Sequence, residues 1–364
     1  MRVLITGGGT GGHCTPAIAV AEALRETDSE LTLAYVGRAS GPESELVPQA
    51  GIDFVGLHLG SLGPSAFGAR PRLAGRLAVA FGQATRLVSR FRPDVVLATG
   101  GYVCVPVSMA ARQRRIPVLM LEQNALPGRA VRWLGSWVRD VATSFPGTAA
   151  YLPRARVVCT GNPVRRPFAE LAGRSTRLGA PHTLLVMGGS QGARNLNGVL
   201  LEALPTLLGA SPQVRVVHLT GPSDHPQVVA AAGAAGIPLG DRYQPLPFVS
   251  DVAERLVAAS LVAMRAGGSS LAEVACVGRP MVLVPYPHAG EHQAANAEIF
   301  EEAGAARVLP DHELRASRFA EVVLEIMGDP ELCQRMASAS SSMARPRAAL
   351  DVAELLGRLA DQRR

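Results

Sequence analysis

Short apolar runs rich in β-branched residues alternate with Ala- and Leu-rich stretches along almost the whole chain. The runs have the length of buried strands, and the stretches between them have the length of helices. We predict strands at residues 3–6, 31–36, 54–59, 95–98, 118–121, 141–145, 157–160, 183–187, 214–219, 261–264 and 281–285. Because apolar strands that alternate with helices form parallel sheets covered on both faces, the pattern predicts an α/β fold.

The pattern occurs twice, since each half of the chain opens with a strand, a glycine-rich loop and a helix. This duplication predicts two Rossmann-like, doubly wound parallel-sheet domains, with ligands at the carboxyl ends of the strands and between the domains. A turn at Gly161, Asn162 and Pro163 separates the two series of strands, so we expect domains over residues 1–162 and 163–344. A last helix within residues 345–364 is expected to pack back on one of them.

Composition and charge narrow the class of protein. The chain has 364 residues, of which 48% are hydrophobic and 4% aromatic, so it can fill two cores and is neither disordered nor fibrous. All 36 basic residues are Arg, and 12 of them lie within residues 60–140 beside only three acidic residues. This asymmetry predicts an anionic partner, either a phosphate-bearing surface or nucleic acid. The scarcity of aromatic residues and of nucleic-acid motifs disfavours nucleic acid.

Cysteine usage and hydropathy indicate the compartment. Five cysteines, an odd number with no CxxC pair, are typical of a reducing cytoplasm. The most apolar stretch, residues 95–111, is interrupted by two glycines and a proline. We therefore expect neither a signal peptide nor a membrane-spanning helix.

The first glycine loop, residues 7–13, follows the first strand and matches GxGxxG. Glycines there allow a tight turn and close approach to a ligand, and a helix N-terminus favours negative charge. We expect the helix to begin with Thr15 as N-cap and Pro16 as its first residue. The second strand leads into Arg38 rather than an acidic residue, which disfavours NAD but leaves the 2′-phosphate of NADP open. A tight turn without any ligand is the plain alternative.

His13 ends this loop and has two interpretations. A histidine at a helix start is often only a polar terminal residue. In a cleft, the same imidazole serves as a general base or donates to a forming anion.

Two further segments in the second half carry polar groups at helix starts. Residues 188–194 repeat the strand, glycine loop and helix start, now with a hydroxyl group, so a diphosphate-containing ligand is favoured over a single dinucleotide. Residues 265–273 place amides and hydroxyls at a helix start, where they suit phosphate oxygens, and a carboxylate at Glu273 that can accept both ribose hydroxyls. However, Ser270 and Glu273 also form a capping box, which would explain both residues structurally.

The segment 285–293 contains His288, Glu291 and His292 in the HxxEH order of some zinc proteases. Zinc binding needs both histidines on one helix face, but the prolines and Gly290 predict that the helix begins near Glu291. No third ligand motif is evident, so zinc chemistry is disfavoured and His292 with Gln293 is better suited to a ligand's hydroxyls.

Residues 72–91 form an amphipathic helix with apolar positions on one face and Arg72, Arg76, Arg86 and Arg90 on a neighbouring one. An ordinary helix that packs on the sheet explains this pattern. The functional alternative is an interfacial helix that lies on anionic lipid.

Taken together, these motifs resemble one family, the MurG-type undecaprenyl-diphospho-muramoylpentapeptide N-acetylglucosaminyltransferases. The matching motifs follow in order along essentially the whole chain: GGTGGH (8–13), GGYV (100–103), EQN (122–124), TGNPVR (160–165), GGSQGA (188–193), FVSD (248–251), RAG (265–267), Glu273 and HQ (292–293). There are three departures from the family pattern, one of which is that Cys14 follows His13. Cys104 replaces a small hydroxyl residue after GGYV, and the turn at 268–270 reads Gly-Ser-Ser instead of Ala-x-Thr.

The resemblance implies the GT-B fold, in which two Rossmann-like domains face each other across a cleft and the C-terminal helix crosses back to the N-terminal domain. It implies an inverting transfer of GlcNAc from UDP-GlcNAc to the C4 hydroxyl of the muramoyl sugar of lipid I (undecaprenyl-diphospho-MurNAc-pentapeptide), which gives lipid II and UDP. Residues 1–162 would then bind the acceptor and the membrane, and residues 163–344 the donor. The family works on the cytoplasmic face of the inner membrane in peptidoglycan synthesis, without a cofactor or metal.

The resemblance also implies site residues. The donor-binding set is Thr10, Gly11, Gly12, Asn124, Arg165, Ser190, Val249, Gly268, Ser269, Ser270, Leu271, Ala272, Glu273 and Gln293. Within it, Glu273 would bind the ribose and the backbone near Val249 the uracil, while Ser190 and the turn at 268–270 would hold the diphosphate. Asn124 and Gln293 would face the sugar. The acceptor-binding set is Gly9, Gly100, Gly101 and Tyr102.

The chemistry needs a base for the acceptor hydroxyl, and we expect His13, with Glu122 as the competing candidate. Three alternative functions stay open at this point. One is another UDP-GlcNAc enzyme of GT-B-like fold, either a 2-epimerase or a different glycosyltransferase. The others are an NADP-binding oxidoreductase that uses GxGxxG with Arg38, and a non-catalytic, membrane-bound nucleotide-binding module.

Overall fold

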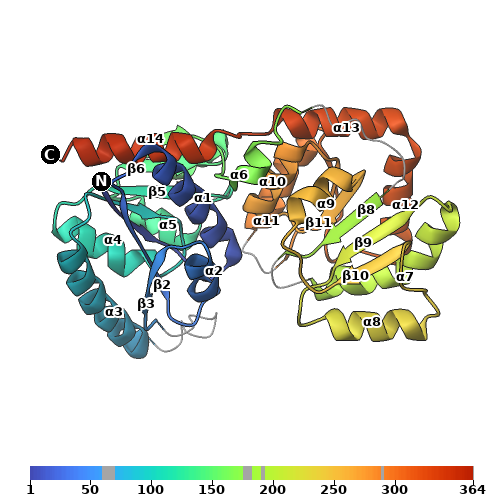
Figure 1. Ribbon diagram of the computed structural model, residues 1–364, viewed down its shortest axis with the longest axis horizontal. Helices are drawn as coiled ribbons and strands as arrows, with labels where there is room; N and C mark the ends of the chain where they lie inside the picture. The colour runs from blue at the N-terminus through green and yellow to red at the C-terminus, as the bar shows by residue number, and fades with distance from the viewer. Residues whose placement is uncertain (60–69, 175–182, 190–192, 288–290, 364) are drawn as a thin grey trace. The chain divides into compact units, whose positions relative to one another are not determined.

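Two parallel sheets organise the chain in the computed structural model, which describes residues 1–59, 70–174, 183–189, 193–287 and 291–363. The backbone divides into two compact units. Unit 1 comprises Met1–Arg166 together with Arg347–Arg364, and unit 2 comprises Pro167–Pro346. The predicted α/β class is confirmed (Figure 1). The expected division at residue 162 differs from the observed one by four residues.

Unit 1 contains a seven-stranded parallel sheet in the order β3-β2-β1-β4-β5-β6-β7 within the described part of the chain. Its strands are β1 (Arg2–Thr6), β2 (Thr32–Arg38), β3 (Asp53–Leu57), β4 (Val95–Ala98), β5 (Val118–Glu122), β6 (Asp140–Thr143) and β7 (Arg156–Cys159). Its helices are α1 (Gly11–Thr27), α2 (Glu43–Gln49), α3 (Arg70–Phe91), α4 (Cys104–Gln113), α5 (Arg129–Leu134), the 3-10 helix η2 (Pro146–Tyr151) and α14 (Ala348–Asp361).

The central strands of this sheet are buried on both faces, because their alternate side chains enter two separate cores. Val3 and Ile5 of β1 pack with α1, α2 and α14, whereas Leu4 packs with α3, α4 and α5. Figure 1 shows α14 beside α1, and the two helices are in contact. This two-sided burial explains why the strands read as continuous apolar runs rather than as alternating ones.

Unit 2 repeats the arrangement with the order β10-β9-β8-β11-β12-β13 in its described residues. Its strands are β8 (Thr183–Met187), β9 (Arg215–Leu219), β10 (Tyr243–Leu246), β11 (Leu261–Met264), β12 (Met281–Leu283) and β13 (Ala306–Val308). Its helices are α7 (Arg194–Ala210), α8 (His225–Ala234), α9 (Val252–Ala258), α10 (Gly268–Val277), α11 (His292–Glu302), α12 (Ala316–Gly328) and α13 (Pro330–Ser342), and α6 (Arg166–Ala169) lies at the division between the units.

The helix α1 begins earlier than the sequence predicted. Thr10 is the N-cap residue, with an extended backbone, and the helix continues through Pro16. The prediction of Thr15 as N-cap was therefore wrong. Gly11 and Gly12 have poor intrinsic helix propensity, but the loop after β1 places them in the first turn, where tertiary position outweighs propensity.

Helix α3 packs on the sheet with the apolar face that the sequence predicted. Ala80, Ala84 and Val88 are buried, and Phe81 and Phe91 pack against the same core. The side chains of Arg72, Leu73, Arg76 and Leu77 lie outside the described residues. The part of the apolar face that is described is thus occupied by the protein core and does not lie on lipid.

Candidate functional site

Strand order brings the first glycine loop and the GGY turn together. The order of the unit 1 sheet reverses between β1 and β4, and at such a switch point the loops after the two strands diverge and leave a crevice. The N–H of Gly8 donates to the carbonyl of Gly100 over 3.3 Å. A Cβ on Gly101, whose φ is +80°, would lie 2.3 Å from the Gly8 carbonyl oxygen. Only glycine allows these two loops to touch.

His13 is held at this switch point by Thr99, which directly follows β4. The His13 Nδ1 lies 2.8 Å from the Thr99 carbonyl oxygen, and the Thr99 hydroxyl donates to the His13 carbonyl over 3.0 Å. A carbonyl oxygen only accepts hydrogen bonds, so Nδ1 carries the hydrogen and Nε2 carries the lone pair of the neutral ring. A Cβ on Gly100 would lie 2.6 Å from the ring. The imidazole is therefore packed in the tautomer that a base requires.

Glu122, the competing base, is engaged by its own loop. It ends β5 and is 2% exposed. Its Oε1 accepts the backbone N–H of Asn124 over 2.9 Å and the Asn124 side-chain amide over 3.0 Å, and its Oε2 accepts the N–H of Gly128 over 3.0 Å. Since both oxygens already accept bonds from donors of the loop, this geometry suits a carboxylate that shapes residues 123–128. Gln123 ties this loop to the switch point by donating to the Thr99 carbonyl over 2.7 Å.

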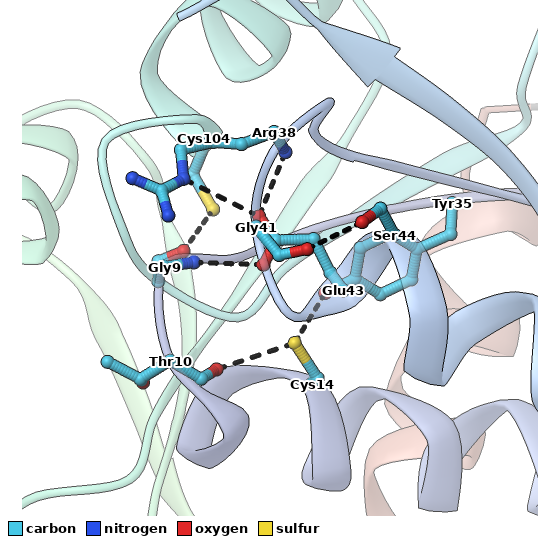
Figure 2. A network of polar contacts seen from close by, with 10 residues as sticks. Gly9, Thr10, Cys14, Tyr35, Arg38, Gly41, Glu43, Ser44 and Cys104 are labelled. Atoms are coloured by element: carbon cyan, nitrogen blue, oxygen red, sulfur yellow. Dashed lines mark hydrogen bonds and ion pairs between the residues drawn. The ribbon is translucent and has the colours of Figure 1, made fainter. Parts of the chain in front are cut away.

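Glu43 is a buried carboxylate that sequence reasoning did not single out. Its Oε2 accepts the N–H of Gly9 over 3.2 Å and its Oε1 accepts the N–H of Arg38 over 2.9 Å (Figure 2). The Arg38 Nε lies 3.9 Å from Oε1. An NADP site would rely on the backbone N–H of the glycine loop and on the Arg38 guanidinium. Because the Gly9 N–H and the Arg38 side chain both face the Glu43 carboxylate, the structure argues against the NADP alternative. A signal was present in the sequence: a Glu soon after the second strand, within a glycine-rich neighbourhood.

The two cysteines near the first glycine loop are protected thiols. Burial, reinforced by the charge of Glu43, raises the pKa of Cys14 to about 12, and burial likewise raises the pKa of Cys104 to about 12. Cys104 Sγ lies 3.2 Å from the carbonyl oxygen of Thr6 and 3.0 Å from that of Gly100, and its single S–H is shared between these two acceptors. These are bonds that a hydroxyl would also make, so the departure at Cys104 preserves the donor that the position requires.

In unit 2, the switch point lies between β8 and β11. Gly188 and Gly189, the latter with φ +86°, follow β8, while Ser190 lies outside the described residues. Helix α10 begins at Gly268 with Gly267 as N-cap, so Ser269 and Ser270 belong to its first turn. Because Ser270 is inside the helix, the capping-box interpretation of Ser270 and Glu273 was wrong. Glu273 lies in the second turn and is 6% exposed.

The remaining predicted residues are spread along unit 2 and the end of unit 1. Val249 lies in the segment after β10, beside Phe248, which is 66% exposed. Gln293 lies in the first turn of α11, where its Oε1 accepts the N–H of Tyr286 over 2.9 Å and its amide N–H groups remain as donors. Arg165 lies one residue before the end of the first segment of unit 1, directly ahead of α6.

The arginine of the RAG motif, Arg265, contacts other residues of unit 2 and has a structural role. Arg265 is 8% exposed and donates to the carbonyl of Val284 over 3.1 Å, pairs with Asp311 and stacks over Tyr286. It fixes the start of the loop before α10 against its neighbours.

The HxxEH segment does not form one helix. Helix α11 begins at His292, with Glu291 as N-cap, and His288 lies outside the described residues. Within the described ranges, no group of three His, Cys, Asp or Glu side chains is arranged to hold a metal ion.

Comparison with known proteins covers nearly the whole chain. Residues 3–143 match the glycosyltransferase family 28 N-terminal domain, and residues 183–352 match the glycosyltransferase family 28 C-terminal domain. A relative from Moorella thermoacetica, "UDP-N-acetylglucosamine--N-acetylmuramyl-(pentapeptide) pyrophosphoryl-undecaprenol N-acetylglucosamine transferase", is 41% identical over 95% of each chain. The chain belongs to this family, the MurG family.

Solved structures agree with this membership of the MurG family. The crystal structure of Acinetobacter baumannii MurG superposes with a TM-score of 0.78 at 28% identity and covers 98% of this chain and 99% of that one. The predicted GT-B fold class is thereby confirmed. A UDP-GlcNAc 2-epimerase from Neisseria meningitidis also superposes, with a TM-score of 0.69 over 98% and 100% of the chains, but at 13% identity it shares the fold alone. The MurG family is therefore favoured over the epimerase alternative.

Proposed function

We propose that this protein transfers GlcNAc from UDP-GlcNAc to the C4 hydroxyl of the muramoyl sugar of undecaprenyl-diphospho-MurNAc-pentapeptide, with inversion at the anomeric carbon. The observation that carries the proposal is the similarity to MurG-family transferases over 95% of both chains. The match is not confined to the nucleotide-binding half, which many UDP-sugar enzymes share, but includes the unit 1 motifs around His13 and Gly100.

The reaction requires a proton acceptor, and we assign this role to His13. The acceptor C4 oxygen forms a bond to the anomeric carbon while the bond from that carbon to the UDP oxygen breaks, and the C4 proton passes to the base. His13 suits this step because Thr99 holds Nδ1–H and leaves the lone pair on Nε2. Gly9, Gly100, Gly101 and Tyr102 are assigned to the acceptor diphosphate, since Gly8 and Gly100 join the two loops at that edge of the sheet. The part of Gly9 is the close approach that its missing side chain allows, because its N–H donates to Glu43.

The departing UDP needs its charge stabilised, and the helix starts of unit 2 supply donors for it. The first turn of α10 offers the backbone amides of Gly268, Ser269 and Ser270 at the positive end of the helix dipole. Glu273, one turn further along, is assigned to the ribose hydroxyls. Gln293, in the first turn of α11, uses its Oε1 to accept from Tyr286, and its amide N–H groups are assigned to the sugar.

Acceptor-dependent release of UDP tests this function. The purified protein is incubated with UDP-GlcNAc, with and without a lipid I analogue, in detergent or lipid. We expect UDP and a disaccharide-lipid product only when the acceptor is present. UDP or a 2-epimerised sugar formed without acceptor would instead support the epimerase alternative, and no product from folded protein in lipid would contradict the proposal.

For membrane association, we propose a surface of unit 1 that we call the Arg–Trp surface: Arg112, Arg115, Trp133, Trp137 and Arg139. The Arg112 guanidinium stacks on Trp137 at 4.7 Å from the ring centroid, and the Trp133 and Trp137 rings meet edge-on at 6.0 Å. A hollow of about 820 Å³ is lined by Trp137 and the three arginines. Arginine beside exposed tryptophan is the combination that suits an anionic headgroup layer.

This surface is compatible with peripheral binding at the cytoplasmic face of the inner membrane, where the acceptor's polyprenyl chain is anchored. No helix within the described ranges is both long and apolar enough to cross a bilayer. The acidic residue beside the hollow, Asp140, accepts a bond from Arg156 over 2.7 Å, so its charge is offset.

Replacing Arg115 by glutamine is expected to weaken binding to vesicles that contain anionic phosphatidylglycerol about fivefold, because one arginine near such a surface is worth about 1 kcal/mol. Trp133→Ala should weaken it as well, since the indole is 49% exposed. Tyr151→Ala is the matched control, because Tyr151 is equally exposed in the same unit but does not line the hollow. Vesicle sedimentation measures the affinities. Equal loss in the Tyr151 variant, or none in either of the others, would refute this assignment.

A further inference from the structure

Glu43 is the first residue of α2, and its side chain is fully buried. The carboxylate joins two loops that follow adjacent strands, since one oxygen accepts from Gly9, after β1, and the other from Arg38, at the end of β2. Figure 2 shows it between these two segments, beside Gly41 and Ser44. A buried carboxylate is tolerated only where donors satisfy it, so the positions of these backbone N–H groups and of the carboxylate depend on one another.

Three glycines make room for this carboxylate. A Cβ on Gly8 would lie 2.0 Å from Glu43 Oε1, one on Gly37 would lie 2.5 Å from its Cγ, and one on Gly41 would lie 2.3 Å from its carboxyl carbon. Gly8 belongs to the first glycine loop, so part of the glycine pattern there accommodates a side chain from within the protein rather than a ligand from outside.

A short chain of contacts leads from Glu43 to His13. Gly9 donates to Glu43, its neighbour Gly8 donates to the Gly100 carbonyl, and Gly100 packs on the His13 ring. With the Gly9 N–H directed inward, the loop keeps one defined shape. A second shape, in which this amide turns toward a ligand, would leave a buried charge with one donor fewer.

We propose that Glu43 is a positioning residue, which locks the first glycine loop in the shape that presents the acceptor-binding backbone and His13 to the acceptor. This inference rests on the proposed transferase function. This positioning role requires a carboxylate at residue 43, because both oxygens of the Glu43 side chain face N–H donors. A glutamine of the same size has one accepting oxygen, and its NH2 group would face one of the two donors.

Steady-state kinetics of Glu43→Gln test the proposal, with Glu45→Gln as the matched control, because Glu45 is exposed on the same helix. Loss of a charge-assisted bond should raise the acceptor KM and lower kcat, each by about tenfold. The affinity for UDP should stay close to that of the wild type, since the residues assigned to its uracil, ribose and diphosphate lie in unit 2, whereas the hydrogen bonds of Glu43 within the described residues go to unit 1 loops. Glu45→Gln should behave as the wild type does.

A merely structural role would predict a different result. It would reduce the amount of folded enzyme and hence the apparent kcat, while the acceptor KM of the remaining enzyme stayed constant; that outcome overturns the proposal. Gly41→Ala provides a second test if Glu43→Gln does not fold. It keeps the carboxylate but displaces it from a position outside the glycine loop, and it should raise the acceptor KM in the same direction.

Amide hydrogen exchange separates this proposal from the function on which it rests. Peptides that cover residues 7–13 should exchange faster in Glu43→Gln than in Glu45→Gln, whether or not the protein transfers sugar. Unchanged exchange of these peptides would contradict the proposal that Glu43 holds the first glycine loop in one conformation. Wild-type protein that transfers no sugar would count against the function alone, because the exchange measurement still decides the role of Glu43.

Discussion

Replacing His13 by alanine is expected to lower kcat by about 10²–10⁴-fold, the range that a positioned general base contributes, while the affinity for UDP-GlcNAc changes little. The imidazole is held through Nδ1 by the Thr99 carbonyl, so its removal takes away the proton acceptor and leaves the loop backbone in place. Steady-state turnover and a direct UDP-GlcNAc binding titration measure the two quantities.

Two further variants test whether the loss of turnover is specific to His13. His58→Ala removes an exposed histidine from the same unit, just after β3, and should leave turnover unchanged. Glu122→Gln keeps the size of the rival base but loses an acceptor for the loop donors Asn124 and Gly128, so it should reduce stability more than it reduces the rate per folded molecule. If His13→Ala kept near-normal turnover while Glu122→Gln abolished it, the assignment of the base would pass to Glu122.

The fold was largely predictable because its strands are buried on both faces and therefore read as unbroken apolar runs. Every predicted strand is present, with bounds displaced by at most two residues. The two strands that the sequence did not reveal, β10 and β13, lie at the edges of the unit 2 sheet. β10 contains Pro245, which an edge strand tolerates, and β13 has three residues, too few to show a period.

The site residues that form contiguous motifs could be predicted from the sequence. Those that reach the site only through the order of the strands could not. The glycine loops and His13 are contiguous motifs, so the sequence identified them. Thr99 and Glu43 act on the first glycine loop from 86 and 34 residues away, because β4 and β2 both neighbour β1. Thr99 carries no short-range signature of this contact, and Glu43 carries only the weak one of a glutamate in the glycine-rich segment after the second strand. The N-cap residues Thr10 and Gly267 were missed for a related reason, since glycine-rich turns at a switch point override local capping preferences.

Unit 2 contains a buried histidine that makes its stability depend on pH. His218 is fully buried, with Nδ1 3.0 Å from the Tyr243 hydroxyl and Nε2 3.0 Å from Asn197 Oδ1. The Asn197 amide donates to the Thr220 carbonyl, over 3.0 Å, and to Asp224, over 3.2 Å, so its Oδ1 must accept from Nε2–H. The hydroxyl then donates to Nδ1, and the neutral ring is fully satisfied.

Burial, with a smaller effect from nearby His225, lowers the pKa of His218 from 6.5 to about 3. Between these values the unfolded chain binds a proton that the folded protein does not. The free energy of unfolding should therefore fall as the pH drops below 6.5, by up to about 1.4 kcal/mol per pH unit from this group, and the loss should level off near the folded pKa. Above pH 6.5 both states hold a neutral ring, and this group adds no pH dependence.

Urea unfolding at a series of pH values measures this effect, with His218→Gln as the comparison. The two tryptophans, Trp133 and Trp137, both lie in unit 1, so their fluorescence reports unit 1 alone, whereas far-UV circular dichroism reports both units. The variant should be less stable at pH 7, because it disrupts the network, but its unit 2 transition should lose less stability between pH 6.5 and 4 than that of the wild type. The fluorescence transition of unit 1 should have the same pH dependence in both proteins. Parallel pH curves for the unit 2 transition would show that His218 titrates normally in the folded protein, in conflict with its burial between Tyr243 and Asn197.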